Sequence, residues 1–202
     1  IERENRNMTK IGIIGAMELE VEELKSEMTV SSIFTRARME FYEGSLNGAN
    51  VVVVRSGIGK VNAALCVQIL VDVFQVSHII NTGVAGSLNA DLDIGDILIS
   101  KDAVHHDMDV TIFGYQLESS CRKVNPGINV RLGHVVSGDQ FISSKEVKER
   151  LINLFHGDCA EMEGASIAHS AYLNKVPFVI IRAISDKADD SAQMDYPTFE
   201  RA

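Results

Sequence analysis

Short apolar segments alternate along the chain with segments whose apolar residues follow helical spacing. The clearest apolar segments are KIGIIG (10–15), VVVVRS (51–56) and PFVIIRAISD (177–186). Strands that are apolar throughout are normally covered on both faces. The alternation therefore predicts an α/β fold with three layers, in which helices flank a mixed, mostly parallel central sheet. The turn at Asn47–Gly48 predicts one antiparallel hairpin in this fold.

The length and composition fit a single domain. The chain has 202 residues, 46% of them hydrophobic, and it shows neither an internal repeat nor a linker that would divide it. We assign residues 9–202 to this domain. Residues 1–8 are polar and lack the apolar core of a signal peptide, so we expect an unstructured leader or residues introduced by cloning, with Met8 as the natural start.

Charge and cysteine content argue against several classes of protein. The formal net charge is −9 and no cluster of Lys and Arg occurs, which argues against binding to nucleic acid or to an anionic membrane surface. No apolar run approaches the ~18 residues of a membrane span. Cys66, Cys121 and Cys159 are odd in number and form no CxxC motif, so we expect a reduced, cytoplasmic protein.

Glycines and acids share the loops where this fold class binds ligands. In open α/β sheets, ligands bind beyond the carboxyl ends of the strands. The loops expected there are 15–20, 56–60, 82–87, 137–142 and 185–190. Their glycines let the backbone approach a ligand closely. Lys60 is the one lysine near the first three of these loops, and no GxxxxGK[ST] motif occurs. The pattern favours a polar, uncharged ligand.

Motifs from residue 10 to residue 190 resemble, in order, those of bacterial 5′-methylthioadenosine/S-adenosylhomocysteine nucleosidases. They are IGIIGAMELEV, SGIGKVNAA, IINTGVAGSL, HHDMDVTIFGY, VSGDQFI, AEMEGASIAH and VIIRAISDKAD. The resemblance implies the nucleoside phosphorylase fold and a homodimer. It implies hydrolysis of the N-glycosidic bond of both nucleosides, and of 5′-deoxyadenosine, to adenine and a ribose product in methionine salvage. It implies no metal and no organic cofactor.

The resemblance assigns catalysis to two acids. Glu20, expected in the first turn of a helix after GIIGAM, would activate water, and Asp186 would donate a proton to N7 of adenine. Arg182 and Ser185 would support Asp186. From the residues alone, Glu20 could instead be a surface acid favoured near a helix N-terminus by about 0.3–1 kcal/mol. Asp186 could likewise be a structural turn cap.

The acids of CAEMEGASIAH are expected to divide between binding and structure. By the resemblance, Glu163 would accept hydrogen bonds from the ribose 2′- and 3′-hydroxyls, and Met162 would contact the ribose. Glu161 could equally belong to the site or be a structural acid. Phe141 is expected to stack on adenine, and the Ile142 backbone to read the adenine edge.

Further positions would complete the pocket. The expected ribose, base and 5′-substituent contacts are Val84, Ala85, Gly86, Ile58 and Tyr196. Val84 stands where relatives commonly have serine, so any hydrogen bond from that serine to the catalytic acid is lost. Tyr196 stands where phenylalanine is common.

The segment HHDMDVTIFGY contains residue types that bind metals, namely His105, His106, Asp107 and Asp109. Their spacing matches no zinc template. The resemblance instead places this loop at a dimer interface, where Val110 and Phe113 would reach into the pocket of the partner subunit.

Two segments are shorter than the resemblance predicts. The chain is short between Tyr115 and Gly133, and it ends at Ala202, where relatives continue a helix that begins near Phe199. Either residues are absent from this sequence, which leaves the C-terminal helix incomplete, or this member is truncated. We expect the first, because true loss of a core helix would expose apolar surface and weaken a small domain. Three alternatives remain: an aminodeoxyfutalosine nucleosidase, a purine nucleoside phosphorylase of the same fold, and a nucleoside-binding module without activity.

Overall fold

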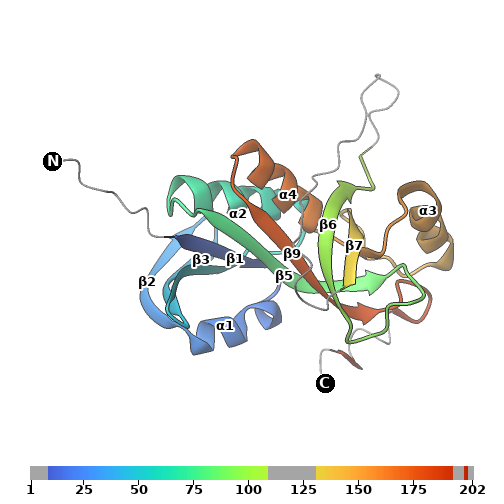
Figure 1. Cartoon of the computed structure of the whole chain (residues 1–202), viewed down its shortest axis with the longest axis horizontal. Helices are drawn as coiled ribbons and strands as arrows, with labels where there is room; N and C mark the ends of the chain where they lie inside the picture. Colours follow the sequence, from blue (N-terminus) through green and yellow to red (C-terminus); the bar gives the residue numbers. More distant parts are fainter. Residues whose placement is uncertain (1–8, 109–130, 193–197, 200–202) are drawn as a thin grey trace.

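The computed structural model describes residues 9–108, 131–192 and 198–199 (Figure 1). Its strands are β1 Lys10–Gly15, β2 Thr29–Arg36, β3 Met39–Leu46, β4 Ala49–Arg55, β5 His78–Ser87, β6 Ile97–His105, β7 Arg131–Ser137, β8 Cys159–Glu161 and β9 Phe178–Asp186. Its helices are the 3₁₀ helix η1 Glu18–Glu20 and the α-helices α1 Glu22–Glu27, α2 Lys60–Asp72, α3 Lys145–Phe155 and α4 Gly164–Leu173.

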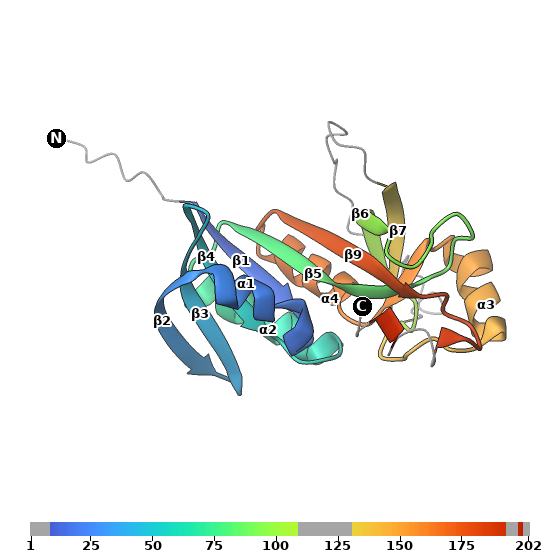
Figure 2. The same ribbon diagram turned by 90° about the horizontal axis from the view of Figure 1, so that it is seen from below.

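The strands form one mixed sheet, which confirms the predicted α/β class. Their order is β2-β3-β4-β1-β5-β8-β7-β6-β9. Among the described strands, five pairings are parallel and four are antiparallel. Helices α2 and α4 lie together on one face, α1 lies on the other, and α3 lies beside β7 (Figures 1 and 2).

A closed ring of strands replaces part of the open three-layer sheet that the sequence predicts. Strand β5 also pairs with β9, so β5, β8, β7, β6 and β9 close on themselves. The register of β5 against β9 shifts between Ala85 and Gly86, and beyond that point Gly86 and Ser87 pair with β8. This bulge bends β5 and turns its end toward a new neighbour. Strand β8 has only three residues, which is too short for a hydrophobic alternation that would predict a strand.

The apolar strands are buried for the reason that their sequences predict. Strand β1 lies between β4 and β5, with Ile13 paired to Val53 on one side and to Ile80 on the other. Helices α2 and α4 pack against each other above them, and Leu70 and Ile167 are fully buried there. No helix among the described residues is long and apolar enough to cross a membrane.

The predicted hairpin is confirmed, and one predicted helix is corrected. Asn47 and Gly48 link β3 to β4 with φ values of 50° and 83°, as a type I′ turn requires. The segment after β1 is not one helix. A 3₁₀ turn ends at Glu20, and α1 begins at Glu22, because Val21 takes φ −131° between them. Glu20 therefore closes a tight turn and does not begin an α-helix.

Leu70 provides a test of the core above β1. A Cβ atom added at Gly12 would lie 2.9 Å from Leu70 Cδ1, so the leucine fills the space that this glycine leaves. We expect Leu70→Ala to lower the free energy of unfolding by about 2–5 kcal/mol, measured by urea denaturation. Leu154→Ala on α3 is the matched control, because Leu154 is 67% exposed, and its effect should stay within about 0.5 kcal/mol. Equal effects of the two variants would contradict this packing.

Candidate active site

One cavity opens at the carboxyl ends of the central strands, where the sequence predicts the site. Its volume is about 480 Å³. Its lining comprises Ala16, Met17, Glu20, Ile58, Val84, Ala85, Gly86, Phe141, Ala160, Glu161, Met162, Glu163, Ser185 and Asp186. Most of the predicted site residues therefore meet in one place, although they come from distant parts of the chain.

Five predicted residues are not part of the cavity lining as the structure describes it. Ile142 lines a small pocket that adjoins the cavity and shares Phe141, Met162 and Asp186 with it. Arg182 lies behind the wall, as described below. Tyr196, Val110 and Phe113 lie outside the described residues. Ala16, Met17 and Ala160 line the cavity without having been predicted, because small or apolar residues beside a strand end carry no chemical signal.

The Glu20 carboxylate is held by three backbone N–H groups. Its Oε2 accepts hydrogen bonds from Ala16 at 2.6 Å and Met17 at 2.9 Å, and its Oε1 accepts one from Val84 at 3.1 Å. A Cβ atom at Gly83 would lie 2.7 Å from Oε1, so β5 needs glycine there to admit the carboxylate. These contacts fix the Glu20 carboxylate in the cavity wall.

Asp186 ends β9 and is 1% exposed. Its Oδ2 accepts a hydrogen bond from the Ser185 hydroxyl at 2.9 Å, and its Oδ1 accepts one from the Ala188 backbone N–H at 2.8 Å. A Cβ atom at Gly86 would lie 2.7 Å from Oδ1. Glycine therefore gives the carboxyl group its room, and Ser185 is the hydroxyl that orients it.

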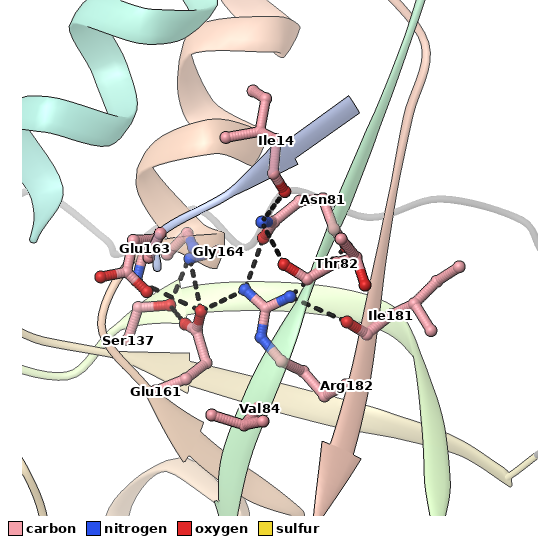
Figure 3. A network of polar contacts seen from close by, with 12 residues as sticks. Ile14, Asn81, Thr82, Val84, Ser137, Glu161, Glu163, Gly164, Ile181 and Arg182 are labelled. Carbon is pink, nitrogen blue, oxygen red and sulfur yellow. Dashed lines mark hydrogen bonds and ion pairs between the residues drawn. The ribbon is translucent and has the colours of Figure 1, made fainter. Parts of the chain in front are cut away.

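Glu161 is anchored by Arg182, as Figure 3 shows. Arg182 is 1% exposed, and its Nη2 lies 2.5 Å from Glu161 Oε2 and 2.5 Å from Asn81 Oδ1. Glu161 also accepts hydrogen bonds from the Ser137 hydroxyl and from the backbone of Gly164. Burial alone would raise the pKa of Glu161, but Arg182 and Ser137 outweigh it and hold the pKa below its usual value.

Glu163 stands at the N-cap of α4 and differs from Glu161 in its partners. Its Oε1 accepts the backbone N–H of Gly59 at 2.7 Å. Burial and the neighbouring charge of Glu161 raise the pKa of Glu163 to about 7, against the opposing effects of Gly59 and Arg182. Both acids of the EMEG motif line the cavity, but they differ in state: Arg182 and Ser137 hold Glu161 as a buried anion, whereas the pKa of Glu163 lies near neutral pH.

The loop after β7 supplies an apolar wall. Phe141 lines the cavity and is 46% exposed, whereas Ile142 is buried beside Val136 and Leu151. The Ile142 side chain therefore anchors this loop in the hydrophobic core.

The histidine-rich segment does not gather metal ligands in the part of the chain that the structure describes, where no group of three or more His, Cys, Asp or Glu could hold a metal ion. The Asp107 carboxylate instead lies 2.6 Å from Lys60 Nζ. Asp109, the fourth residue of the pattern, lies outside the described residues.

Comparisons with known proteins agree with this geometry. The model of the Phosphorylase superfamily matches residues 10–201. A 5′-methylthioadenosine/S-adenosylhomocysteine nucleosidase of an Exiguobacterium species is 41% identical over 94% of this chain and 90% of its own length. A Staphylococcus aureus nucleosidase of the same name is 42% identical over 94% of this chain and 91% of its own length.

Solved structures show the same likeness. The nucleosidase of Colwellia psychrerythraea in complex with adenine has a TM-score of 0.90 at 36% identity and covers 96% of this chain and 90% of its own. A futalosine hydrolase of Helicobacter pylori has a TM-score of 0.86 at 32% identity and covers 96% of this chain and 92% of its own.

The buried ion pair generates a prediction with a defined dependence on pH. Arg182→Met leaves Glu161 charged and unpaired, so the free energy of unfolding should fall by about 3–5 kcal/mol. The pKa of Glu161 lies below its usual value in the folded protein, so the wild type keeps the contribution of this group above pH 4.5 and loses it only in more acidic solution. In the variant, burial without Arg182 raises that pKa, so the deficit should be larger at pH 8 than at pH 5.

Urea denaturation at both pH values measures this effect. Arg55→Met is the matched control, because the Arg55 side chain is 56% exposed and lies 3.6 Å from Glu18, and it should cost less than about 1 kcal/mol. A deficit in Arg182→Met that does not grow between pH 5 and pH 8 would contradict the assignment of Glu161 as the buried anion.

Proposed function

This chain belongs to the 5′-methylthioadenosine/S-adenosylhomocysteine nucleosidases of the Phosphorylase superfamily. We propose that it hydrolyses the N-glycosidic bonds of methylthioadenosine and S-adenosylhomocysteine and that the cavity is its active site. The products are adenine and the 5-thioribose compound. The observation that carries the proposal is the meeting of Glu20, Glu163 and Asp186 in one cavity. These acids supply the three requirements of the reaction: an activated water, a stabilised ribose and a protonated leaving base.

Asp186 is the proposed acid that protonates the departing adenine. Cleavage of the glycosidic bond places electrons on adenine, and a proton delivered to N7 makes the departing base neutral. Ser185 and the Ala188 backbone bind the two carboxyl oxygens from opposite ends of the group, so the carboxyl keeps one orientation in the cavity. Phe141 forms the apolar wall against which the purine stacks.

Glu20 is the proposed base that activates the attacking water. A carboxylate acts best as a base towards water when its position and orientation are fixed before the reaction. The N–H groups of Ala16, Met17 and Val84 provide that placement. The proton leaves water as its oxygen attacks the anomeric carbon.

Glu163 is the proposed acceptor for the ribose 2′- and 3′-hydroxyls. Two carboxylate oxygens match a vicinal diol, and the negative charge stabilises the oxocarbenium-like transition state. The charged form is the one that accepts both hydroxyl hydrogens, and Glu163 reaches it as the pH rises through about 7. Met162 lies beside it in the cavity wall.

Water is favoured over phosphate because the chain's own carboxylates already bind the donors near the cavity. Glu161 pairs with Arg182, Asp107 pairs with Lys60, and Glu163 accepts the N–H of Gly59. A phosphate ion would have to displace these anions and approach Glu20 against charge repulsion. This arrangement opposes the phosphorylase alternative and supports hydrolysis.

Aminodeoxyfutalosine is a second candidate substrate, favoured by the structural likeness to the Helicobacter pylori futalosine hydrolase. Its adenine and ribose would use the same contacts. The adenine and ribose of 5′-deoxyadenosine would also use these contacts. The three substrates differ in the 5′-substituent, for which Ile58, which is 53% exposed at the cavity rim, and Tyr196 are the expected contacts.

The exposed face of α2 supports a homodimer. Val61 is 79% exposed and Leu65 is 44% exposed, one helical turn apart and next to Ile58 at the cavity rim. Helices that are apolar on all sides are normally covered. A second copy of this face would cover the row. By the sequence resemblance, Val110 and Phe113 would contribute to the pocket of the partner subunit. Free, buried Cys66 and Cys159 fit a cytoplasmic location.

The activity is tested by following free adenine from methylthioadenosine with and without phosphate. We expect release at equal rates in both, with methylthioribose as the product. Release that requires phosphate and yields methylthioribose-1-phosphate would show a phosphorylase instead.

The roles of the acids are tested by conservative variants. We expect Asp186→Asn and Glu20→Gln to lower kcat by at least about a hundredfold, while adenine binding measured by calorimetry survives. Glu22→Gln is the matched control, because Glu22 is exposed on α1, and its kcat should equal that of wild type. Turnover near the wild-type rate in either active-site variant removes that acid from its role.

The interface is tested by Val61→Glu combined with Leu65→Glu, which should convert a dimer to a monomer in light-scattering measurements, because each change buries a charge in the interface. Leu154→Glu on α3, also at an exposed leucine, should leave the mass unchanged. A double variant that keeps the wild-type mass would exclude this face.

A further inference from the structure

The segments that follow β4, β6 and β7 meet through Lys60, Asp107 and Asp139, which we call the polar clasp. Lys60 Nζ lies 2.6 Å from Asp107 Oδ1, and the Lys60 backbone N–H donates to Asp139 Oδ1 at 2.8 Å. The Asp139 backbone N–H donates to Asp107 Oδ2 at 3.0 Å. Each residue thus contacts the other two, and the clasp joins the first residue of α2 to the segments that follow β6 and β7.

Gly59 is held between the clasp and the ribose-binding acid. Its φ of 97° belongs to the left-handed region, and a Cβ atom there would lie 3.1 Å from Asp139 Oδ1. Its N–H donates to Glu163 Oε1 at 2.7 Å, and the next residue along the chain is Lys60. A shift of the clasp would therefore move the hydrogen bond that Glu163 receives.

The same clasp holds the loop that carries Phe141. Asp139 lies two residues before Phe141. The His106 backbone N–H donates to Ser137 O at 2.9 Å, which docks the start of this loop on the end of β6. The backbone of Phe141, whose side chain is 46% exposed, therefore follows directly from a segment that the clasp holds. The clasp therefore reaches both the ribose side and the adenine side of the cavity.

We propose that the polar clasp is a positioning device that sets the Gly59 N–H against Glu163 and holds the Phe141 loop over the purine. None of its three residues lines the cavity. The inference rests on the proposed function and deepens it, since it assigns residues outside the cavity wall to the binding of the ribose diol.

A dependence on pH follows from the groups that face Glu163. Glu161 on β8 and Glu20 on η1 raise its pKa, as burial does, whereas the Gly59 N–H and Arg182 on β9 lower it. Loss of the Gly59 contact removes one of the two opposing effects, so the pKa of Glu163 should rise above about 7. Since the charged form binds the diol, the acid limb of kcat/KM should move to higher pH.

The experiment compares wild type with Asp107→Asn and Lys60→Met, which break the same ion pair from its two ends. In both variants we expect KM for methylthioadenosine to rise roughly tenfold with a smaller change in kcat. The acid limb of kcat/KM should move up by roughly one pH unit, the size expected for one lost hydrogen bond to a charged acceptor. Lys60→Arg keeps the charge and should recover part of the loss.

Lys10→Met is the matched control. Lys10 pairs with Glu43 at 2.7 Å, at the opposite end of β1 from the cavity, so this variant loses an ion pair of the same kind without changing the pH profile. A clasp that only stabilised the fold would lower the unfolding temperature and leave both KM and the acid limb in place. That result would overturn the proposal.

A readout independent of turnover separates this inference from the proposed function. The carboxyl carbon of Glu163, observed by NMR during a pH titration and assigned with Glu163→Gln, reports its pKa directly. We expect a higher pKa in Asp107→Asn and Lys60→Met than in wild type, whatever the substrate. An unchanged pKa of Glu163 would overturn the clasp, whereas absence of adenine release from wild-type protein would overturn the proposed function alone.

Discussion

The ion pair between Arg182 and Glu161 is the contact on which the site depends. It joins β9 to β8, and through the Ser137 hydroxyl it reaches β7. Arg182 also binds Asn81 on β5, whose amide donates to Ile14 O on β1 at 3.0 Å (Figure 3). Strand β1 of the open sheet is thus tied to four strands of the closed ring, β5, β7, β8 and β9. A buried pair of this kind stabilises only when its remaining hydrogen-bonding groups are satisfied, and the surrounding strands satisfy most of them.

The acids of the cavity differ in how firmly the protein binds them, and this difference matches their proposed tasks. Glu20 and Asp186, which must each meet one reacting atom, are each fixed by at least two donors. Glu161 serves the fold. Within the described part of the chain, the Glu163 carboxylate accepts one hydrogen bond, from Gly59. Its other oxygen can therefore turn to a ligand, and its raised pKa is the cost of partial burial without a cation of its own.

Much of this arrangement follows from sequence, and the exceptions have physical reasons. The apolar strands, the Asn47–Gly48 turn and the position of the cavity were predictable, because burial, turn chemistry and the strand-end rule act locally or through the fold class. The closed ring was not, because it depends on one bulge in β5 and on the three residues of β8. The role of Glu161 could not be decided, because its partner Arg182 lies 21 residues away, and only the packed structure shows which acid that cation faces.

The place of Val84 shows how the site accommodates a departure from the usual pattern. Glu20 is bound by the backbone N–H of Val84 and not by its side chain, so a change of side chain leaves this contact intact. The hydroxyl that reaches Asp186 comes from Ser185, which supplies the kind of contact that a serine at position 84 would otherwise be expected to make. Gly86, two residues further along β5, lies opposite Asp186 in the register with β9. The end of β5 therefore accommodates the carboxyl groups of Glu20 and Asp186 through its backbone and its glycines, and the Val84 side chain lines the cavity as an apolar group.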